Sequence, residues 1–272
     1  MGLETARGFW AFSGARGASS LVEVLLEWVD VIAVFILLGP AAGGIYGAVN
    51  RCVRVGVMLD HTARIVTGPV ISSALATGDI ARAREVFSSA TRLLILGAWP
   101  FYLLLMIFGP AVMALFGPGF HSGAPALVII GAAMLLSVSA GGVQSVLLMG
   151  GHSGWQLLNK TAALAVALPL NFALIPNWGI AGAATAWAAA VLVDCSLAAL
   201  QVGIVMKITA PLRSLLLPAT LALAIFGVGG FLIRLNWGPS LQGLLAALGL
   251  GGAMYAGALA LLHRRKLISL RP

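Results

Sequence analysis

The chain has 272 residues, of which 60% are hydrophobic and only 9% are charged, and its mean hydropathy is +1.03. Because a soluble domain carries about a quarter charged residues, this composition excludes an ordinary water-soluble globular protein. The formal net charge of +8 is typical of basic cytoplasmic loops in a membrane protein, and we expect no nucleic-acid binding.

Apolar stretches of about 20 residues recur along the chain, which is the length that an α-helix needs to cross a bilayer. Backbone groups in lipid must pair internally, so the sequence predicts an all-α polytopic membrane protein with about eight transmembrane helices. These are expected at 17–39, 43–75, 93–115, 124–149, 156–176, 180–206, 212–234 and 240–262.

Three parts of the chain are predicted. Residues 1–16 form a cytoplasmic N-terminal segment, which we expect to be retained because Glu23, Glu27 and Asp30 interrupt the apolar run of any signal peptide. Residues 17–208 form a six-helix transmembrane bundle, and 209–272 add a transmembrane helix pair with a basic cytoplasmic tail. The polar stretch 76–92 between the second and third spans is expected to be an exposed turn with a short amphipathic helix.

The distribution of basic residues predicts the topology. With the N-terminus inside the cell, twelve Lys and Arg residues fall in cytoplasmic segments and only Arg234 falls outside. This bias places both termini in the cytoplasm. A seven-span alternative, in which 43–75 does not cross, is less favoured because it would translocate Arg7 and Arg16. The cytoplasmic residues are Arg7, Arg16, Arg82, Arg84, Arg92, Lys160, Lys207, Arg213, Arg264, Arg265, Lys266 and Arg271.

Enzymatic motifs are absent from the sequence. It has no Gly-x-Ser-x-Gly, no phosphate-binding loop of the Walker type and no His-Glu-x-x-His. The four histidines are scattered, and Cys52 and Cys195 match no metal or redox spacing, so they are interpreted as small core residues. We therefore predict no enzyme activity, no cofactor and no metal site.

The first span carries three acids on one face. Glu23, Glu27 and Asp30 are spaced i, i+4 and i+7, which aligns them on one stripe of a helix. Because charges within a bilayer are costly, such residues face a cavity or a partner. Two interpretations stay open: a stripe that lines an aqueous cavity, and a stripe that packs against arginines as structure.

The second span supplies candidate partners. Arg51 and Arg54 lie near its outer end, while Asp60 and Arg64 form an i, i+4 pair further in. A pair of guanidinium groups in a cavity suits a pyrophosphate, although snorkelling of Arg51 and Arg54 to the membrane interface is the alternative. The predicted substrate or ion pathway is thus Glu23, Glu27, Asp30, Arg51, Arg54, Asp60 and Arg64.

Fewer polar residues occur in the later spans. Asp194 is the one deep acid there, and we expect it to pair with a neighbouring hydroxyl or amide. Other polar positions either line the same cavity or bridge helices, and the sequence does not separate these two roles. They are Gln144, Asn159, Lys160 and Asn171.

Several motifs resemble the polysaccharide flippases of the multidrug/oligosaccharidyl-lipid/polysaccharide exporter superfamily. Trp28-Val-Asp30, Leu38-Gly39-Pro40, the run 44–48 and Arg51 resemble the seventh and eighth helices of that family. The run 115–120 with 124–127 resembles the turn before its tenth helix. The eleventh and twelfth helices are similar to 149–152, 157–160 and 171–184.

The resemblance implies a MATE-like flippase that translocates lipid-linked oligosaccharide by alternating access in a bacterial cytoplasmic (inner) membrane. It covers the C-terminal bundle of that family alone, so the implied partners are membrane lipids, a lipid-linked oligosaccharide and a second six-helix bundle, either a separate chain or a second copy in a homodimer. The rival functions are one half of a small-molecule or drug antiporter, and a non-transporting membrane subunit or truncated remnant.

Overall fold

The computed structural model describes the backbone of residues 3–264, and the side chains in that range except those of 3–12, 15–16, 212–213 and 263. The basic tail predicted at Arg265, Lys266 and Arg271 lies outside the described residues. All regular elements in the described range are helical, which confirms the predicted all-α class. The longer ones are α1 (Leu3–Leu38), α2 (Pro40–Ala76), α3 (Ile80–Ile107), α5 (Ala124–Ala140), α7 (Ser153–Ile204) and α10 (Leu241–Arg264).

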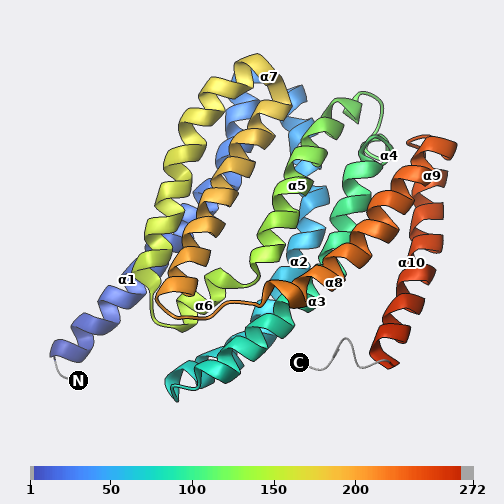
Figure 1. The fold of residues 1–272 in the computed structure, drawn as a ribbon. Coiled ribbons are helices and arrows are strands. Elements are labelled where there is room, and N and C mark those ends of the chain that lie inside the picture. Colours follow the sequence, from blue (N-terminus) through green and yellow to red (C-terminus); the bar gives the residue numbers. More distant parts are fainter. Residues whose placement is uncertain (1–2, 265–272) are drawn as a thin grey trace.

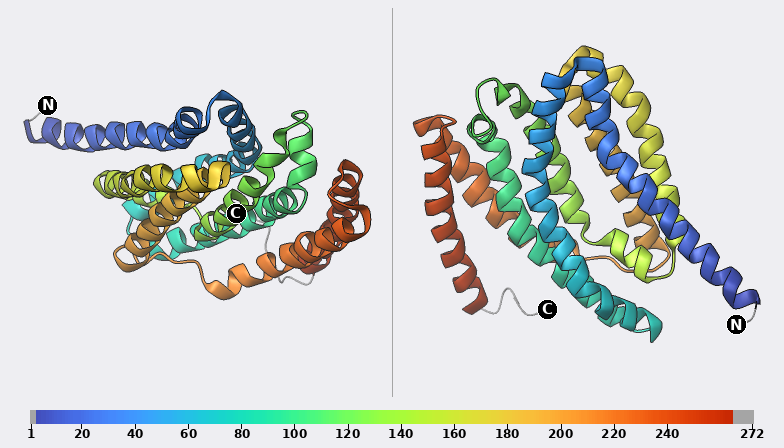
Figure 2. Two further views of the ribbon diagram at one scale, coloured as in Figure 1. Left: turned by 90° about the horizontal axis from the view of Figure 1, so that it is seen from above. Right: turned by 180° about the vertical axis from the view of Figure 1, so that it is seen from behind.

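The helices run up and down between two ends of a bundle (Figure 1). Seen from above, α1 and the C-terminal helices α8–α10 lie on opposite faces, with α3, α5 and α7 between them (Figure 2, left). α1 packs along α7, whereas α3 joins α2 and α5 to the C-terminal helices. α1 begins, and α10 ends, at the end that also holds the α2–α3 turn (Figure 1).

Five of the described helical segments are long and apolar enough to cross a membrane: 80–107, 120–140, 153–204, 214–237 and 241–262. α7 has 52 residues and bends at Gly179, where φ is 56° and ψ is −136°, so its two arms run antiparallel. α1 and α2 are long enough but carry the charges described above, so hydropathy alone does not select them. Counting both arms of α7, residues 3–264 make eight passes between the two ends, in agreement with the predicted number.

Some element boundaries differ from those expected. α1 already starts at Leu3, inside the predicted N-terminal segment. Asp79 caps α3 by accepting a hydrogen bond from the Arg82 backbone N–H at 2.9 Å, and the helix continues unbroken to Ile107. The predicted short amphipathic helix in 76–92 is therefore the first part of the third span.

The predicted span 124–149 is broken. α5 ends at Ala140, and α6 (Val143–Met149) begins after Gly141 and Gly142. Gly141 has a φ of 72°, and a Cβ there would overlap the Thr91 hydroxyl, so only glycine fits this backbone beside α3. A break within a membrane helix is tolerated where the backbone lines a cavity or is covered by protein.

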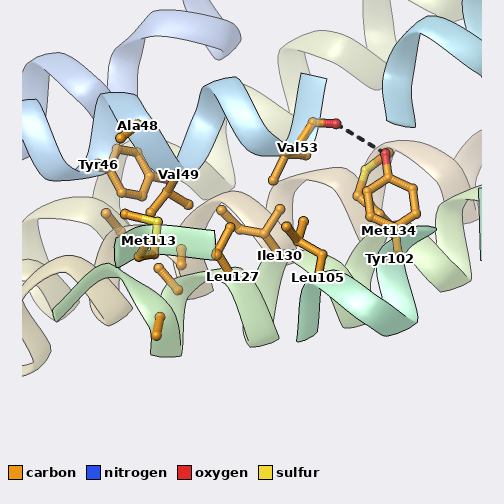
Figure 3. Close-up of a cluster of buried hydrophobic side chains, with 14 of the residues drawn as sticks. Tyr46, Ala48, Val49, Val53, Tyr102, Leu105, Met113, Leu127, Ile130 and Met134 are labelled. Atoms are coloured by element: carbon orange, nitrogen blue, oxygen red, sulfur yellow. Dashed lines mark hydrogen bonds between the residues drawn. The ribbon is translucent and has the colours of Figure 1, made fainter. Parts of the chain in front are cut away.

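The main hydrophobic core holds α2, α3 and α5 together (Figure 3). Tyr46, Tyr102 and Leu127 are fully buried in it, and the Tyr102 hydroxyl donates to the Val53 carbonyl at 3.4 Å. Gly56 on α2 lets the Tyr102 ring approach, because a Cβ at that position would overlap the phenol. This core fixes α2 as one wall of the bundle.

The C-terminal helices α8 (Leu212–Ala222) and α9 (Gly230–Trp237) are joined through a π-helical segment at Leu223–Gly229 and return through α10. They attach to α3 by hydrogen bonds to main-chain carbonyls. Tyr255 donates to the Leu96 carbonyl at 3.0 Å, and Arg234 donates to the Ile107 carbonyl at 2.7 Å. Pro100 has no N–H to bond the carbonyl four residues earlier, so Tyr255 occupies an acceptor that the proline leaves open.

Candidate functional site: a polar cavity between α1, α2, α6 and α7

A cavity of about 960 Å³ lies between α1, α2, α6 and both arms of α7. Its wall extends from Asp30 and Asn171, within about 12 Å of the end of the bundle that holds the α7 bend, towards Gln156 and Ser72 near the opposite end. Polar and charged side chains of all four elements reach it. Charged residues within membrane helices require such a polar cavity, or a partner, between the two ends of the bundle.

The acid stripe on α1 faces this cavity, and each acid has a different partner. Glu27 forms an ion pair with Arg54 of α2. Glu23 lies 3.3 Å from the ammonium of Lys160 on the first arm of α7. Asp30 is buried and accepts hydrogen bonds from the Tyr46 hydroxyl at 2.5 Å and from the Val31 backbone N–H at 3.0 Å.

Lys160 connects three helical segments. Its Nζ lies 2.9 Å from Asp194 Oδ2 on the second arm of α7, in addition to its contact with Glu23 on α1. The side chains of Lys160 and Asp194 are 12% and 10% exposed, so this pair is shielded from water. Asp194 was expected to pair with a hydroxyl or amide; that prediction is wrong, because a cation 34 residues away in the chain reaches it.

Arg54 is in a different environment. Its side chain is 54% exposed and that of Glu27 is 44% exposed, so their ion pair is open to the cavity. The guanidinium carbon also lies 5.8 Å from the centre of the Trp28 ring, a cation–π contact that holds the arginine against α1. An exposed pair of this kind contributes little to stability and exchanges partners easily. Arg54 is thus the cation best placed to bind an anionic ligand.

The remaining predicted residues of α2 divide into two groups. Arg64 lines the cavity and bonds Asp60 at 2.7 Å, as the i, i+4 spacing indicated, but Asp60 does not line it. Both residues also border a small pocket beside Gly142 and Ser145, at the break between α5 and α6. Arg51 is exposed, does not line the cavity and forms no ion pair with any residue that the structure describes. The structure therefore does not bring Arg51 and Arg54 together as a double clamp on this cavity.

The structure separates the polar residues that line the cavity from those that bridge helices, two roles that the sequence left open. Gln144, Lys160 and Asn171 line the cavity. Asn159 instead bridges helices, because its amide and that of Gln201 on the other arm of α7 bond each other at 2.7 and 2.8 Å. Within residues 3–264, no group of three or more His, Cys, Asp and Glu side chains is placed to hold a metal ion.

Sequence reasoning missed Tyr46, Gln156 and the pairing of Lys160. Tyr46 was noted only within the run 44–48 that carries the family resemblance, although a buried tyrosine needs a hydrogen-bond partner and Asp30 of the adjacent span supplies it. Gln156 opens the first arm of α7 and lies four residues before Lys160, on the same face. No local spacing connects Lys160 to Glu23 or Asp194.

The fold is similar to that of a known flippase. No family model matches the chain. The structure superposes on lipid II flippase MurJ in its inward closed conformation with a TM-score of 0.66 at 12% sequence identity. The match covers 90% of this chain and 52% of that chain, so the class that the fold defines is a membrane protein with half of a MurJ-like architecture.

A sequence relative supports the assignment to membrane proteins. YabM of Bacillus subtilis (strain 168), an uncharacterised membrane protein, is 28% identical over 180 residues. The match covers 63% of this chain and 34% of the relative, so the chain spans about a third to a half of the proteins that it resembles.

Proposed function

We propose that this chain is one helical bundle of a flippase that translocates a lipid-linked oligosaccharide by alternating access. The observation that carries the proposal is Arg54, a cation held by Trp28 and an exposed ion pair in the wall of a polar cavity of about 960 Å³. A guanidinium binds phosphate oxygens through paired donors, and a pyrophosphate that competes with Glu27 would displace only an exposed carboxylate. The fold, which matches about half of a lipid II flippase, supports the same assignment.

The acid stripe takes two roles in this proposal. Asp30 and Glu23 are fixed by Tyr46 and Lys160, so they maintain the positions of α1, α2 and α7. Glu27 is the acid that releases Arg54 when an anion arrives, and it balances that charge when the cavity is empty. The substrate pathway is accordingly Arg54, Arg64 and Glu27, with Asp30, Glu23 and Asp60 as the supporting acids.

A second bundle is part of the proposal. Lipid cannot solvate a pyrophosphate or bond sugar hydroxyls, so a translocation cavity needs protein on all sides. α1 and α2 supply one polar wall, and their remaining surface exposes large apolar side chains. We propose that another six-helix bundle, either in a separate chain or in a second copy of this one, closes the cavity. The whole lies in a bacterial cytoplasmic membrane with both termini inside.

One observation favours a different cargo. The cavity wall holds four carboxylates, Glu23, Glu27, Asp30 and Asp194, against the three permanent cations Arg54, Arg64 and Lys160. An excess of acid suits a cationic small molecule, as in a drug antiporter half. We rank this second because all four acids already have a partner within the protein: Lys160 for Glu23 and Asp194, Arg54 for Glu27, and the Tyr46 hydroxyl for Asp30.

The test is flipping in proteoliposomes that contain the chain in its native assembly, using a fluorescent polyprenyl pyrophosphate oligosaccharide whose outer-leaflet label is quenched chemically. Arg54→Gln should reduce the flipping rate at least tenfold while leaving abundance and insertion unchanged. The control is Arg82→Gln, which also breaks an exposed Arg–Glu pair, with Glu85 at 2.9 Å, but lies outside the cavity. Full flipping by Arg54→Gln would contradict the proposal, and uptake of a cationic dye without lipid flipping would favour the antiporter.

A further inference from the structure

Unpartnered polar atoms gather at the cavity. In the described part of the chain, eight buried side-chain nitrogen or oxygen atoms have no hydrogen-bond partner, and five of them belong to four cavity-lining residues. Buried polar atoms are normally bonded, so a concentration at one wall indicates groups that a ligand or water completes. These residues are Gln144, Gln156, Asn171 and Asp194.

Gln144 and Gln156 share one part of this wall. Gln144 is 4% exposed, and neither atom of its amide is bonded; Gln156 is 9% exposed, and its Oε1 is unbonded. Gln144 projects from α6, a short helix between the pairs Gly141–Gly142 and Gly150–Gly151, and Gln156 lies in the first turn of α7 just beyond the second pair. The break in the membrane helix thus presents two amides from adjacent elements to the same cavity.

A second pair of buried amides, away from the cavity, provides a comparison for the unbonded amides of Gln144 and Gln156. Asn159 and Gln201, which do not line the cavity, bond each other reciprocally across the two arms of α7. Asn159 lies only one turn from Gln156 on the same helix. The buried amides of Asn159 and Gln201 thus satisfy each other, whereas Gln144 and Gln156 at the cavity wall keep amide atoms without a partner.

We propose that Gln144 and Gln156 form a subsite for the sugar hydroxyls of a lipid-linked substrate, separate from the phosphate contact at Arg54. This inference rests on the proposed flippase function. An amide offers both a donor and an acceptor, as does a sugar hydroxyl, so the two are complementary. A phosphate has acceptors only and would leave the glutamine oxygens unbonded. The neighbouring cation, Lys160, is already paired with Asp194 and Glu23.

The experiment compares binding of two lipids by the chain, purified in the assembly in which it leaves the membrane, using native mass spectrometry in mild detergent. The probes are a polyprenyl pyrophosphate that carries a disaccharide and the same lipid without sugar. The wild-type protein should bind the sugar-bearing lipid about tenfold more tightly, a gain typical of a few hydrogen bonds. Gln144→Met with Gln156→Met keeps side-chain volume and removes the amides, so it should abolish this ratio and leave binding of the sugar-free lipid unchanged.

The control variant, Asn159→Leu with Gln201→Met, removes two buried amides outside the cavity and should keep the tenfold ratio. If the double variant does not fold, Gln156→Met alone replaces it in the experiment, and it should reduce the ratio of affinities for the sugar-bearing and the sugar-free lipid. If the glutamine variants weaken both lipids equally, or if the sugar-dependent ratio persists in them, the amides bind only water or support the wall, and the subsite is disproved. A wild-type protein that binds neither lipid would overturn the flippase proposal itself.

Discussion

Lys160 holds Asp194 at 2.9 Å and Glu23 at 3.3 Å, so one ammonium group connects α1 to both arms of α7. The Lys160 side chain is 12% exposed, and little water is available to replace its partners. A buried charge that loses its partner is strongly destabilising, whereas removal of the whole pair often costs little.

This arrangement predicts a double-mutant result. Lys160→Met should destabilise the protein by about 3 kcal/mol, because it leaves Asp194 buried and unpaired. Lys160→Met with Asp194→Leu should recover most of that loss. Thermal unfolding in detergent, followed by loss of the monodisperse peak, measures both. Arg82→Met, which breaks an exposed pair at the start of α3, should change stability by less than about 1 kcal/mol. Equal effects of Lys160→Met and Arg82→Met would contradict the inference.

The bond between Tyr46 and Asp30 gives a second prediction. Tyr46 is fully buried and donates to the Asp30 carboxylate at 2.5 Å. Tyr46→Phe should cost about 2 kcal/mol, since the carboxylate loses its side-chain donor without gaining water. Tyr102→Phe is the matched control, because that hydroxyl reaches only a neutral carbonyl at 3.4 Å, and its loss should cost less than about 1 kcal/mol. The measurement is the unfolding temperature of each variant relative to the wild-type protein in the same detergent, and a drop for Tyr46→Phe no larger than that for Tyr102→Phe would contradict the prediction.

The contact of α2 with α3 predicts a packing asymmetry between two glycines. Gly56→Ala places a methyl group on the Tyr102 ring in a filled core, and we expect a loss of about 1–3 kcal/mol. Gly47→Ala, on the same helix with open space around its Cβ, should change stability by less than about 0.5 kcal/mol. If both alanines prove neutral in thermal unfolding, α2 and α3 do not pack as closely as described.

Both termini are expected in the cytoplasm. In a background with Cys52 and Cys195 replaced, single cysteines at Leu3 and Ile268 should react with a membrane-impermeant maleimide only after the cells are permeabilised. A cysteine at Trp237, the last residue of α9 before the turn into α10, should react in intact cells. Labelling of Leu3→Cys from outside would exclude the eight-pass topology in favour of the seven-span alternative.

Local signals in the sequence predicted the helices well. The boundary expected between the spans 17–39 and 43–75 falls at the α1–α2 turn, and the i, i+4 spacing of Asp60 and Arg64 identified a true ion pair. The break at Gly141 was missed because the apolar run continues through it, although the adjacent glycines were a usable signal. The stripe of acids on α1 was recognised, but the partners Tyr46 and Lys160 were not, since they depend on how α2 and α7 pack. Arg51 was grouped with Arg54 by proximity in sequence, yet the rotation of α2 turns it away from the cavity.

The bond from Tyr255 to the Leu96 carbonyl has a consequence for biogenesis. The two residues are 159 positions apart, so at ordinary rates of translation roughly 10–30 s pass between their synthesis. Throughout that interval the acceptor opened by Pro100 has no donor from α10, while α3 is already long and apolar enough to enter the bilayer. Until Tyr255 is made, water in the insertion channel or a lipid head group has to donate the hydrogen bond to the Leu96 carbonyl. The third span is therefore completed only when the last helix arrives, and release of the nascent chain before Tyr255 would leave α3 with an open carbonyl in hydrocarbon.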